Sequence, residues 1–290
     1  MKNKLSRATV VLLILFVLQS CSMRRFAIRQ ATPVFEDAVK AFYEEDNLNI
    51  ARPALASNLK LMEGLLKSDP ENDAIRLLLA QGYAGYALAF AEDSDQTEAR
   101  HLYMRAKNYA QEVLKHALNL KENWALTPRS VAIALQKANR SDVPALFWTG
   151  FAWAGAINLS LEDPGALLDL PKVEQIMTRV RQLDSTYFYG AVYLFFGSIY
   201  GQKPRILGGN PSKAKSLFET NLKITKGKFL LSYVYAAKFY AAKVLDEALF
   251  DQYLKKVLNT PLSIAPEIKL LNQVAKQKAR RLQAQKDEIF

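Results

Sequence analysis

Apolar residues recur at helical spacing along almost the whole chain beyond its first twenty residues. An apolar stripe every three to four positions is typical of an amphipathic α-helix, and no convincing run of strand-like alternation is present. Gly and Pro gather at a few points that indicate turns, such as Asp69-Pro70 and Asp163-Pro164-Gly165. The sequence therefore predicts an all-α fold, with helices over residues 32–46, 53–67, 72–92, 96–120, 128–138, 143–160, 170–183, 187–202, 211–224, 228–244, 246–259 and 264–286.

Small and aromatic residues recur in these helices at the spacing of tetratricopeptide repeats. The first helix of such a repeat carries an apolar residue, a small residue and, three positions later, an aromatic; small residues let the paired helix approach closely. We predict a tetratricopeptide-like helix-pair superhelix with diverged, partly extended repeats, and an unrelated helical bundle is the alternative. The predicted repeat-packing residues are Ala80, Tyr83, Ala99, Gly150, Gly197, Ala214, Phe218 and Ala237.

Three predicted helices, at 146–159, 187–202 and 229–242, are rich in aromatic and small residues. A helix that is apolar all round lies inside a core or turns one face to a hollow, and buried tyrosines need a partner or water for their hydroxyls. A solid core and an apolar ligand chamber or channel both remain open interpretations. For the chamber, the predicted lining residues are Trp153, Tyr189, Tyr193, Phe196, Tyr200 and Tyr240. Beside the tyrosine stripe of helix 187–202 runs a second stripe, Phe188, Val192, Phe195 and Ile199.

The first twenty residues have the layout of a secretory signal peptide. Three positive charges precede an apolar run from Ala8 to Leu18, which is shorter than the about 20 residues that a spanning helix needs. The run ends in Leu18-Gln19-Ser20-Cys21, which resembles the bacterial lipobox, in which the cysteine is alkylated with diacylglycerol and becomes the acylated N-terminus. A plain signal peptide is the alternative, but no Ala-x-Ala cleavage site lies nearby. We therefore predict that Cys21 is lipidated.

These features predict the organisation of the chain. A lipoprotein signal peptide over 1–20 is followed by a short basic linker over 21–31 and a single all-α repeat domain over 32–290. Ser22 stands where Asp would favour retention in the inner membrane. We therefore expect a protein of the bacterial periplasm that is held by its lipid anchor, at the outer rather than the inner membrane.

Charge and residue types argue against several classes of function. The net charge is +11, of which the signal peptide carries three, but no winged-helix or OB pattern accompanies it, so we expect no nucleic-acid partner. The histidines, His101 and His116, have no Cys or His partner at ligand spacing, so we expect no metal site. Gly208-Gly209-Asn210 lacks the P-loop pattern and fits a helix cap. We expect no catalytic residues and no cofactor.

The segment "GSIYGQKPRILGGNPSKAKSLFETNL" (197–222), together with residues 98–114 and 233–261, resembles the T-component (TatT) family of lipoproteins associated with TRAP transporters. The resemblance runs over nearly the whole mature chain. It implies a lipid-anchored, tetratricopeptide-like homo-trimer that docks a periplasmic substrate-binding protein of a TRAP system. It also implies a pore in each protomer for a small apolar or carboxylate ligand.

Two functions therefore remain open. The first is a transport accessory that binds a substrate-binding protein and channels a small ligand. The second is a pure scaffold lipoprotein that binds envelope proteins or peptides without a small ligand. An internal cavity favours the first, because we expect a scaffold to be solid inside.

Overall fold

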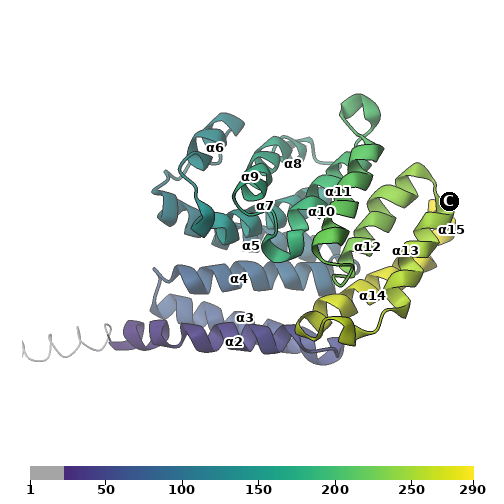
Figure 1. The fold of residues 1–290 in the computed structure, drawn as a ribbon. Helices are drawn as coiled ribbons and strands as arrows, with labels where there is room; N and C mark the ends of the chain where they lie inside the picture. Colours follow the sequence, from purple (N-terminus) through teal and green to yellow (C-terminus); the bar gives the residue numbers. More distant parts are fainter. Residues whose placement is uncertain (1–22) are drawn as a thin grey trace, which may run out of the picture.

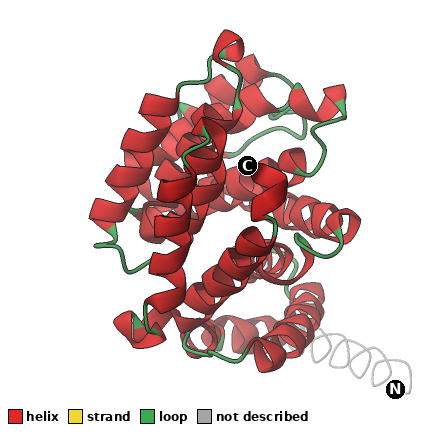
Figure 2. Ribbon diagram, turned by 90° about the vertical axis from the view of Figure 1, so that its right-hand side faces the viewer, coloured by secondary structure: helices red, strands yellow, loops and turns green. Residues whose placement is uncertain are grey.

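The computed structural model describes residues 23–290, and every regular element in that range is a helix, which confirms the all-α prediction (Figure 1, Figure 2). The predicted signal peptide and Cys21 lie outside the described residues. Residues 23–30 form a first helical segment. The elements that follow are α2 (Thr32–Tyr43), α3 (Leu48–Ser68), α4 (Asp73–Tyr86), η1 (Ala87–Ala91), α5 (Gln96–Leu118), α6 (Pro128–Leu135), η2 (Arg140–Asp142), α7 (Val143–Asn158), α8 (Pro164–Leu167), α9 (Leu170–Leu183), α10 (Tyr187–Gln202), η3 (Arg205–Leu207), α11 (Pro211–Ile224), α12 (Leu231–Ala236), η4 (Ala237–Ala241), η5 (Ala242–Val244), α13 (Glu247–Asn259), η6 (Leu262–Ile264), η7 (Pro266–Ile268), α14 (Lys269–Ala284) and α15 (Lys286–Ile289).

Successive helices pack against one another, and the chain then curls back towards its start (Figure 1). Direct contacts join α4 to α5, α5 to α7, and α7 to α9, and further along α10 to α11 and α12 to α13. The last long helix, α14, contacts α12 and α13 and also α2 and α3. The C-terminal helices therefore return to the N-terminal ones, and the fold surrounds a common interior.

Two of the predicted helices are interrupted where alanine is frequent. The helix predicted over 72–92 changes at Ala87 into the π-helix η1, and the one predicted over 228–244 divides into α12, the π-helix η4 and the short turn η5. A π-turn holds more residues than an α-turn and is wider. The alanines at the ends of these two π-helices are fully buried, so the small side chains let a wider turn fit between neighbouring helices.

Small residues occupy the closest contacts between helices. A Cβ atom at Gly197 would lie 2.8 Å from the ring of Phe218 on α11, and one at Gly150 would lie 2.5 Å from Met177 Sδ on α9. Without a side chain at these positions, α10 approaches α11 and α7 approaches α9. The structure buries all eight residues named above for repeat packing: Ala80, Tyr83, Ala99, Gly150, Gly197, Ala214, Phe218 and Ala237.

Among the described residues, one helical stretch, Asp73–Ala91, is long and apolar enough to cross a membrane by length and composition alone. This stretch is α4 continued by η1. Its residues Ile75, Leu79 and Tyr83 are buried, and α4 contacts α3, α5 and α7. These contacts are those of a central core helix, which explains its apolar composition.

Glu63 ties α3 to α4 and α5 through a nearly buried carboxylate. Its Oε1 accepts hydrogen bonds from Tyr83 Oη at 2.7 Å and Tyr109 Oη at 3.0 Å. The carboxylate also pairs with Lys60 and Arg105. Burial by itself raises the pKa of Glu63, but the hydrogen bonds and the Arg105 charge outweigh it and lower the pKa to about 2.

We expect Glu63→Gln to lower the free energy of unfolding by about 1–2 kcal/mol at pH 7, because an amide accepts these hydrogen bonds less strongly than a carboxylate. A pKa lowered on folding gives stability that is present above the unfolded pKa of about 4.5 and is lost as the pH falls towards about 2. Urea unfolding at pH 7 and pH 3 measures both. The difference between variant and wild type should be smaller at pH 3, and an equal difference would contradict this role of the carboxylate.

Candidate ligand cavity

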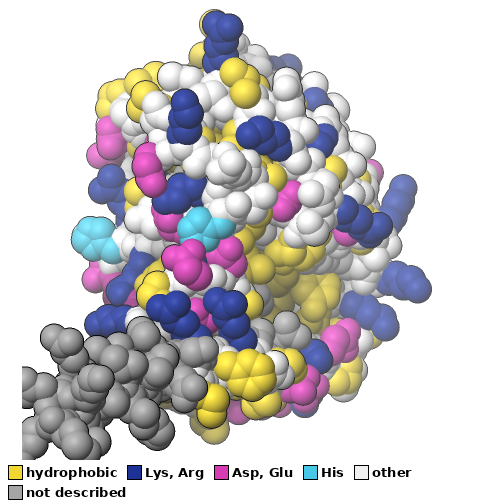
Figure 3. All heavy atoms as spheres, turned by 90° about the vertical axis from the view of Figure 1, so that its left-hand side faces the viewer, with side chains coloured by type: hydrophobic (Ala, Val, Ile, Leu, Met, Phe, Trp, Pro, Cys, Tyr) yellow, Lys and Arg dark blue, Asp and Glu magenta, His cyan; other side chains and the backbone are white. Residues whose placement is uncertain are grey.

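The curled chain forms a partly open cavity of about 780 Å³. Its wall combines residues from α2, α3 and α4 near the start of the fold with residues from α7, α10, α12 and α14. Figure 3 shows a face of the molecule on which hydrophobic side chains surround a hollow. The volume lies within the range of about 300–1,000 Å³ that is usual for sites of small organic ligands.

Aromatic rings form much of the wall. Trp148 on α7 contacts Phe151 edge-on, with ring centroids 5.6 Å apart, and Phe188 at 4.8 Å. Such edge-to-face contacts fix the rings relative to one another, so the wall is formed by rigid groups. The aromatic lining residues are Phe35, Phe42, Tyr43, Phe90, Tyr103, Trp148, Phe151, Phe188, Phe195, Phe229, Tyr235 and Phe239.

Glycine residues and the two π-helices form parts of the cavity wall where bulky side chains are absent or a wider helical turn is present. A Cβ atom at Gly85 on α4 would meet no atom within 4 Å, so this part of the wall has no side chain over it. Gly155 on α7 lies under the ring of Tyr103, which a Cβ atom would approach to 2.7 Å. Residues of both η1 and η4 line the cavity, among them Phe90 and Phe239. π-Turns occur frequently at functional sites.

An unusual backbone turn places Phe188 in the wall. Phe188, Tyr189 and Gly190 have φ values of 44°, 60° and 65°, so α10 begins with a left-handed turn. The buried Asn221 on α11 holds this turn, because its Nδ2 donates to the carbonyl oxygens of Tyr189 and Gly190 at 2.8 Å each. Asn221 Oδ1 in turn accepts from the Ser232 hydroxyl. Asn221 therefore stabilises the part of the cavity wall that carries Phe188.

Charged groups of opposite sign meet at one part of the mainly apolar wall. Lys278 on α14 is 8% exposed, and its Nζ lies 2.9 Å from Asp93 Oδ2 and 3.8 Å from Glu92 Oε1. Tyr103 Oη donates to Glu92 Oε2 at 2.7 Å. Lys278 and Asp93 are 185 residues apart in the chain, so this ion pair joins the last long helix to the end of η1. These side chains link α14 to the end of η1 in the cavity wall, and they offer polar groups to a ligand.

The phenols of the wall are uncharged at neutral pH. Burial raises the pKa of Tyr103 and of Tyr235 well above the ordinary value, and the nearby Glu92 and Asp93 raise both further. Burial also raises the pKa of Tyr43, whose Oη accepts a hydrogen bond from Gln81 Nε2 at 2.6 Å. A ligand in the cavity therefore meets neutral aromatic rings over most of its surface.

The six residues predicted to line a chamber are not among the lining residues of this cavity. Trp153 is buried and donates from Nε1 to Asp169 Oδ2 at 3.1 Å. Tyr189 stacks on Phe229 with ring centroids 5.0 Å apart. The other four lie elsewhere in the packing: Phe196 under Arg181, Tyr200 under Lys213, and Tyr193 and Tyr240 half-buried against the core.

Neighbouring residues of the same helices line the cavity instead. On α10 these include Phe188, Phe195 and Ile199, which belong to the second stripe of that helix. On α7 and η4 they are Trp148 and Phe239. One position along a helix turns a side chain by about 100°, so choosing the adjacent stripe moves every predicted contact to another face.

The wall also includes helices that the aromatic-rich pattern did not indicate, among them α4, η1 and α14. Gln81, Gly85 and Leu88 lie on the first two, and Lys278 lies on α14. The stretch "GYAGYALAFA" (82–91) carries a usable signal, because two glycines and four alanines in ten helical positions leave room beside them. Nothing in the residues of α14 itself indicates that this helix lines the cavity, since its position depends on contacts with the N-terminal helices α2 and α3.

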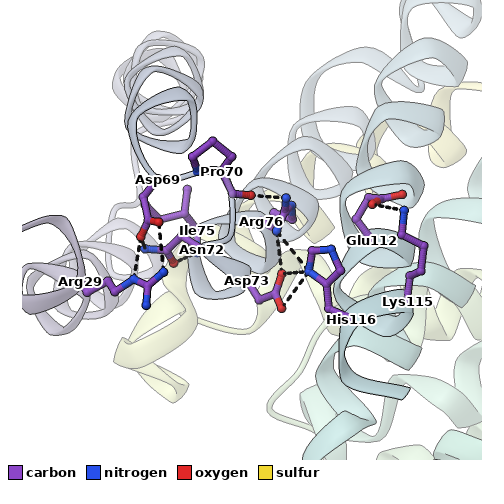
Figure 4. A network of polar contacts seen from close by, with 10 residues as sticks. All are labelled: Arg29, Asp69, Pro70, Asn72, Asp73, Ile75, Arg76, Glu112, Lys115 and His116. Carbon is purple, nitrogen blue, oxygen red and sulfur yellow. Dashed lines mark hydrogen bonds and ion pairs between the residues drawn. The ribbon is translucent and has the colours of Figure 1, made fainter. Parts of the chain in front are cut away.

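Among residues 23–290, no three His, Cys, Asp or Glu side chains form a group that could hold a metal ion. His116 instead lies with Nδ1 3.0 Å from Asp73 Oδ1, on the outside of the α4–α5 pair (Figure 4).

Comparison with known proteins gives the family. An uncharacterized protein of Treponema pallidum (strain Nichols) is 25% identical over 270 residues, which cover 88% of this chain and 84% of that protein. The sequence pattern of the TRAP transporter T-component family matches residues 44–290, which hold almost all of the cavity wall. The chain belongs to the TRAP transporter T-component family.

Proposed function

We propose that this protein is a lipid-anchored accessory component of a TRAP-type transport system that holds or channels a small apolar or carboxylate ligand. The observation that carries this proposal is the aromatic cavity of about 780 Å³ inside a member of the T-component family. The scaffold alternative needs no such interior, so the cavity favours the ligand-holding function. No catalytic step is part of the proposal.

The proposed architecture is a single tetratricopeptide-like repeat domain over 32–290 that assembles as a homo-trimer. The contacts of α4 with α5, α10 with α11 and α12 with α13 support helix pairing. The close approach of Gly197 to Phe218 is the contact that the repeat pattern requires between paired helices. The proposed partner is a periplasmic substrate-binding protein of the same transport system, which would deliver or receive the ligand.

Purification from native membranes in mild detergent tests this function. We expect a substrate-binding protein to co-purify, and mass spectrometry of an organic extract to find an apolar or amphiphilic small molecule in about equal amount to the protein. The mass of the assembly should correspond to three copies. Recovery of envelope proteins or peptides with an empty cavity would instead support the scaffold function.

Cys21→Ser tests the proposed anchor. A serine hydroxyl does not replace the thiolate in the lipid transfer, so we expect a precursor that is neither acylated nor cleaved at residue 21. Metabolic labelling with a radioactive fatty acid and membrane fractionation measure this. Labelled, membrane-bound protein in the variant would refute lipidation at Cys21, and Ser22→Ala is the matched control, which should be labelled as the wild type is.

A further inference from the structure

The start of the described chain is fixed to the turn between α3 and α4 (Figure 4). The guanidinium of Arg29 makes two bonds to the buried carboxylate of Asp69, from Nε to Oδ2 at 2.8 Å and from Nη2 to Oδ1 at 3.1 Å. Asn72 Nδ2 donates to the same Asp69 Oδ2 at 3.1 Å. This bidentate pair holds the helical segment 23–30 against the body of the protein.

The distance from this turn to an acylated Cys21 is short. Arg29 lies eight positions after Cys21 along the chain. A chain of that length spans at most about 28 Å when extended and about 12 Å when helical. If Cys21 carries the lipid, the α3–α4 turn is therefore held near the membrane surface.

A basic cleft lies at the same turn, between α3, α4 and α5. Its lining carries four cations and a single carboxylate. Lys67 stands two residues before Asp69 and makes no ion pair with any residue between 23 and 290. Lys60 and Arg105 share the carboxylate of Glu63, so two positive charges face one negative charge there. The lining residues are Lys60, Glu63, Leu66, Lys67, Pro70, Arg76, Arg105 and Tyr109.

The surroundings of the cleft hold Arg76 in place, and they carry the exposed Glu71 as well as further cations. Arg76 donates to the carbonyl oxygen of Pro70, and its Nη1 pairs with Asp73 at 2.8 Å, so its guanidinium is held at the turn (Figure 4). Arg24 and Arg25 lie on the helical segment 23–30, which is the tether between Cys21 and the body of the protein, and both are exposed. Leu66 and Pro70 give the cleft an apolar part beside its cations.

We propose that this cleft binds the headgroup of an anionic phospholipid in the membrane to which the protein is tethered. The proposal rests on the lipid anchor of the proposed function. A phosphodiester offers the oxygens that Lys and Arg side chains bind, and the short tether brings it within reach. The bound headgroup fixes which side of the molecule faces the bilayer, whereas the acyl anchor alone leaves the molecule free to rotate.

Lysine modification on bilayer nanodiscs tests the proposal. The full acylated protein is loaded on discs of phosphatidylcholine alone or of phosphatidylcholine with phosphatidylglycerol, and treated with an amine-reactive ester. We expect Lys60 and Lys67 to react at least threefold more slowly on the anionic discs. Lys255, exposed on α13, is the reference and should react equally on both.

Two variants sharpen the result, with Lys67 as the reporter in both. Lys60→Glu removes a cation from the cleft and adds a carboxylate, so the protection of Lys67 on anionic discs should fall by at least half. Lys255→Glu makes the same charge change on α13 and should leave that protection unchanged. Equal melting temperatures establish that both variants are folded.

Several outcomes overturn the proposal. Equal reaction rates on the two kinds of disc, or protection at Lys255 as large as at Lys67, would exclude a headgroup site in the cleft. Equal protection by inorganic phosphate on neutral discs would assign the cleft to soluble anions instead. Absence of the protein from neutral discs would show that the lipid anchor itself has failed, which is a separate result.

Discussion

Replacing Gly85 by Phe is expected to weaken the binding of an apolar probe at least tenfold while the protein stays folded. Gly85 lines the cavity, and a Cβ atom there meets nothing within 4 Å, so we expect the added ring to enter the cavity. The ring occupies volume that the ligand needs. Phe is also a better helix former than Gly, so the free energy of unfolding should rise by roughly 0.3–0.5 kcal/mol. Titration with the fluorescent probe N-phenyl-1-naphthylamine and thermal melting measure the two effects.

Gly64→Phe is the matched control for this experiment. Gly64 is also helical, and a Cβ atom there also meets nothing within 4 Å, but the residue is exposed on α3 and does not line the cavity. The Gly64→Phe variant should change the free energy of unfolding by a similar amount and should bind the probe as the wild type does. Equal probe binding by Gly85→Phe, Gly64→Phe and the wild type would mean that apolar molecules bind outside the cavity. The ligand-holding function would then lose its main support.

Asn221→Ala is expected to lower the free energy of unfolding by about 3–5 kcal/mol. The change removes two hydrogen bonds to the carbonyl oxygens of Tyr189 and Gly190 and one from Ser232. A buried polar group without its partner costs about 1–3 kcal/mol, and non-glycine residues in the left-handed region are already about 1–2 kcal/mol unfavourable each. Urea denaturation followed by circular dichroism gives the free energy directly.

Thr220→Ala on the same helix serves as the comparison. Thr220 is partly exposed, and its hydroxyl donates to the Ser216 carbonyl one turn earlier, so its loss should change stability by less than about 0.5 kcal/mol. If Asn221→Ala cost no more than Thr220→Ala, the left-handed turn would not depend on Asn221. We also expect Asn221→Ala to alter probe binding, because the turn places Phe188 in the cavity wall.

The sequence predicts the helices well because the apolar stripe of each helix is formed by that helix's own residues. The residues of α5 and α11, for example, form helices close to the predicted ranges 96–120 and 211–224. The aromatic-rich central helices can likewise be predicted from their own residues. The face that each helix turns to the interior is not local, since it depends on where the neighbouring helices lie.

The start of α10 illustrates the limit of pattern reasoning. A continuous right-handed helix from Tyr187 would put Tyr189 and Tyr193 on one stripe. The left-handed turn at 188–190 breaks that register, and its carbonyl groups accept hydrogen bonds from Asn221, which lies about thirty residues away on α11. A periodic pattern carries no information on such a distant hydrogen bond. The π-turns in η1 and η4 change the register of their helices in the same way.

The ion pair between Lys278 and Asp93 has a consequence for the order of folding. Synthesis proceeds from the N-terminus, so α2 and α3, which α14 contacts, exist long before α14 is complete. Until then their apolar sides lack the cover that Leu270, Val274 and Leu282 provide. Contacts of such high sequence separation form slowly, and a half-made chain with exposed apolar surface is prone to aggregation. Removing the last twenty residues should therefore harm the yield of folded protein more than removing twenty residues from an exposed tail would.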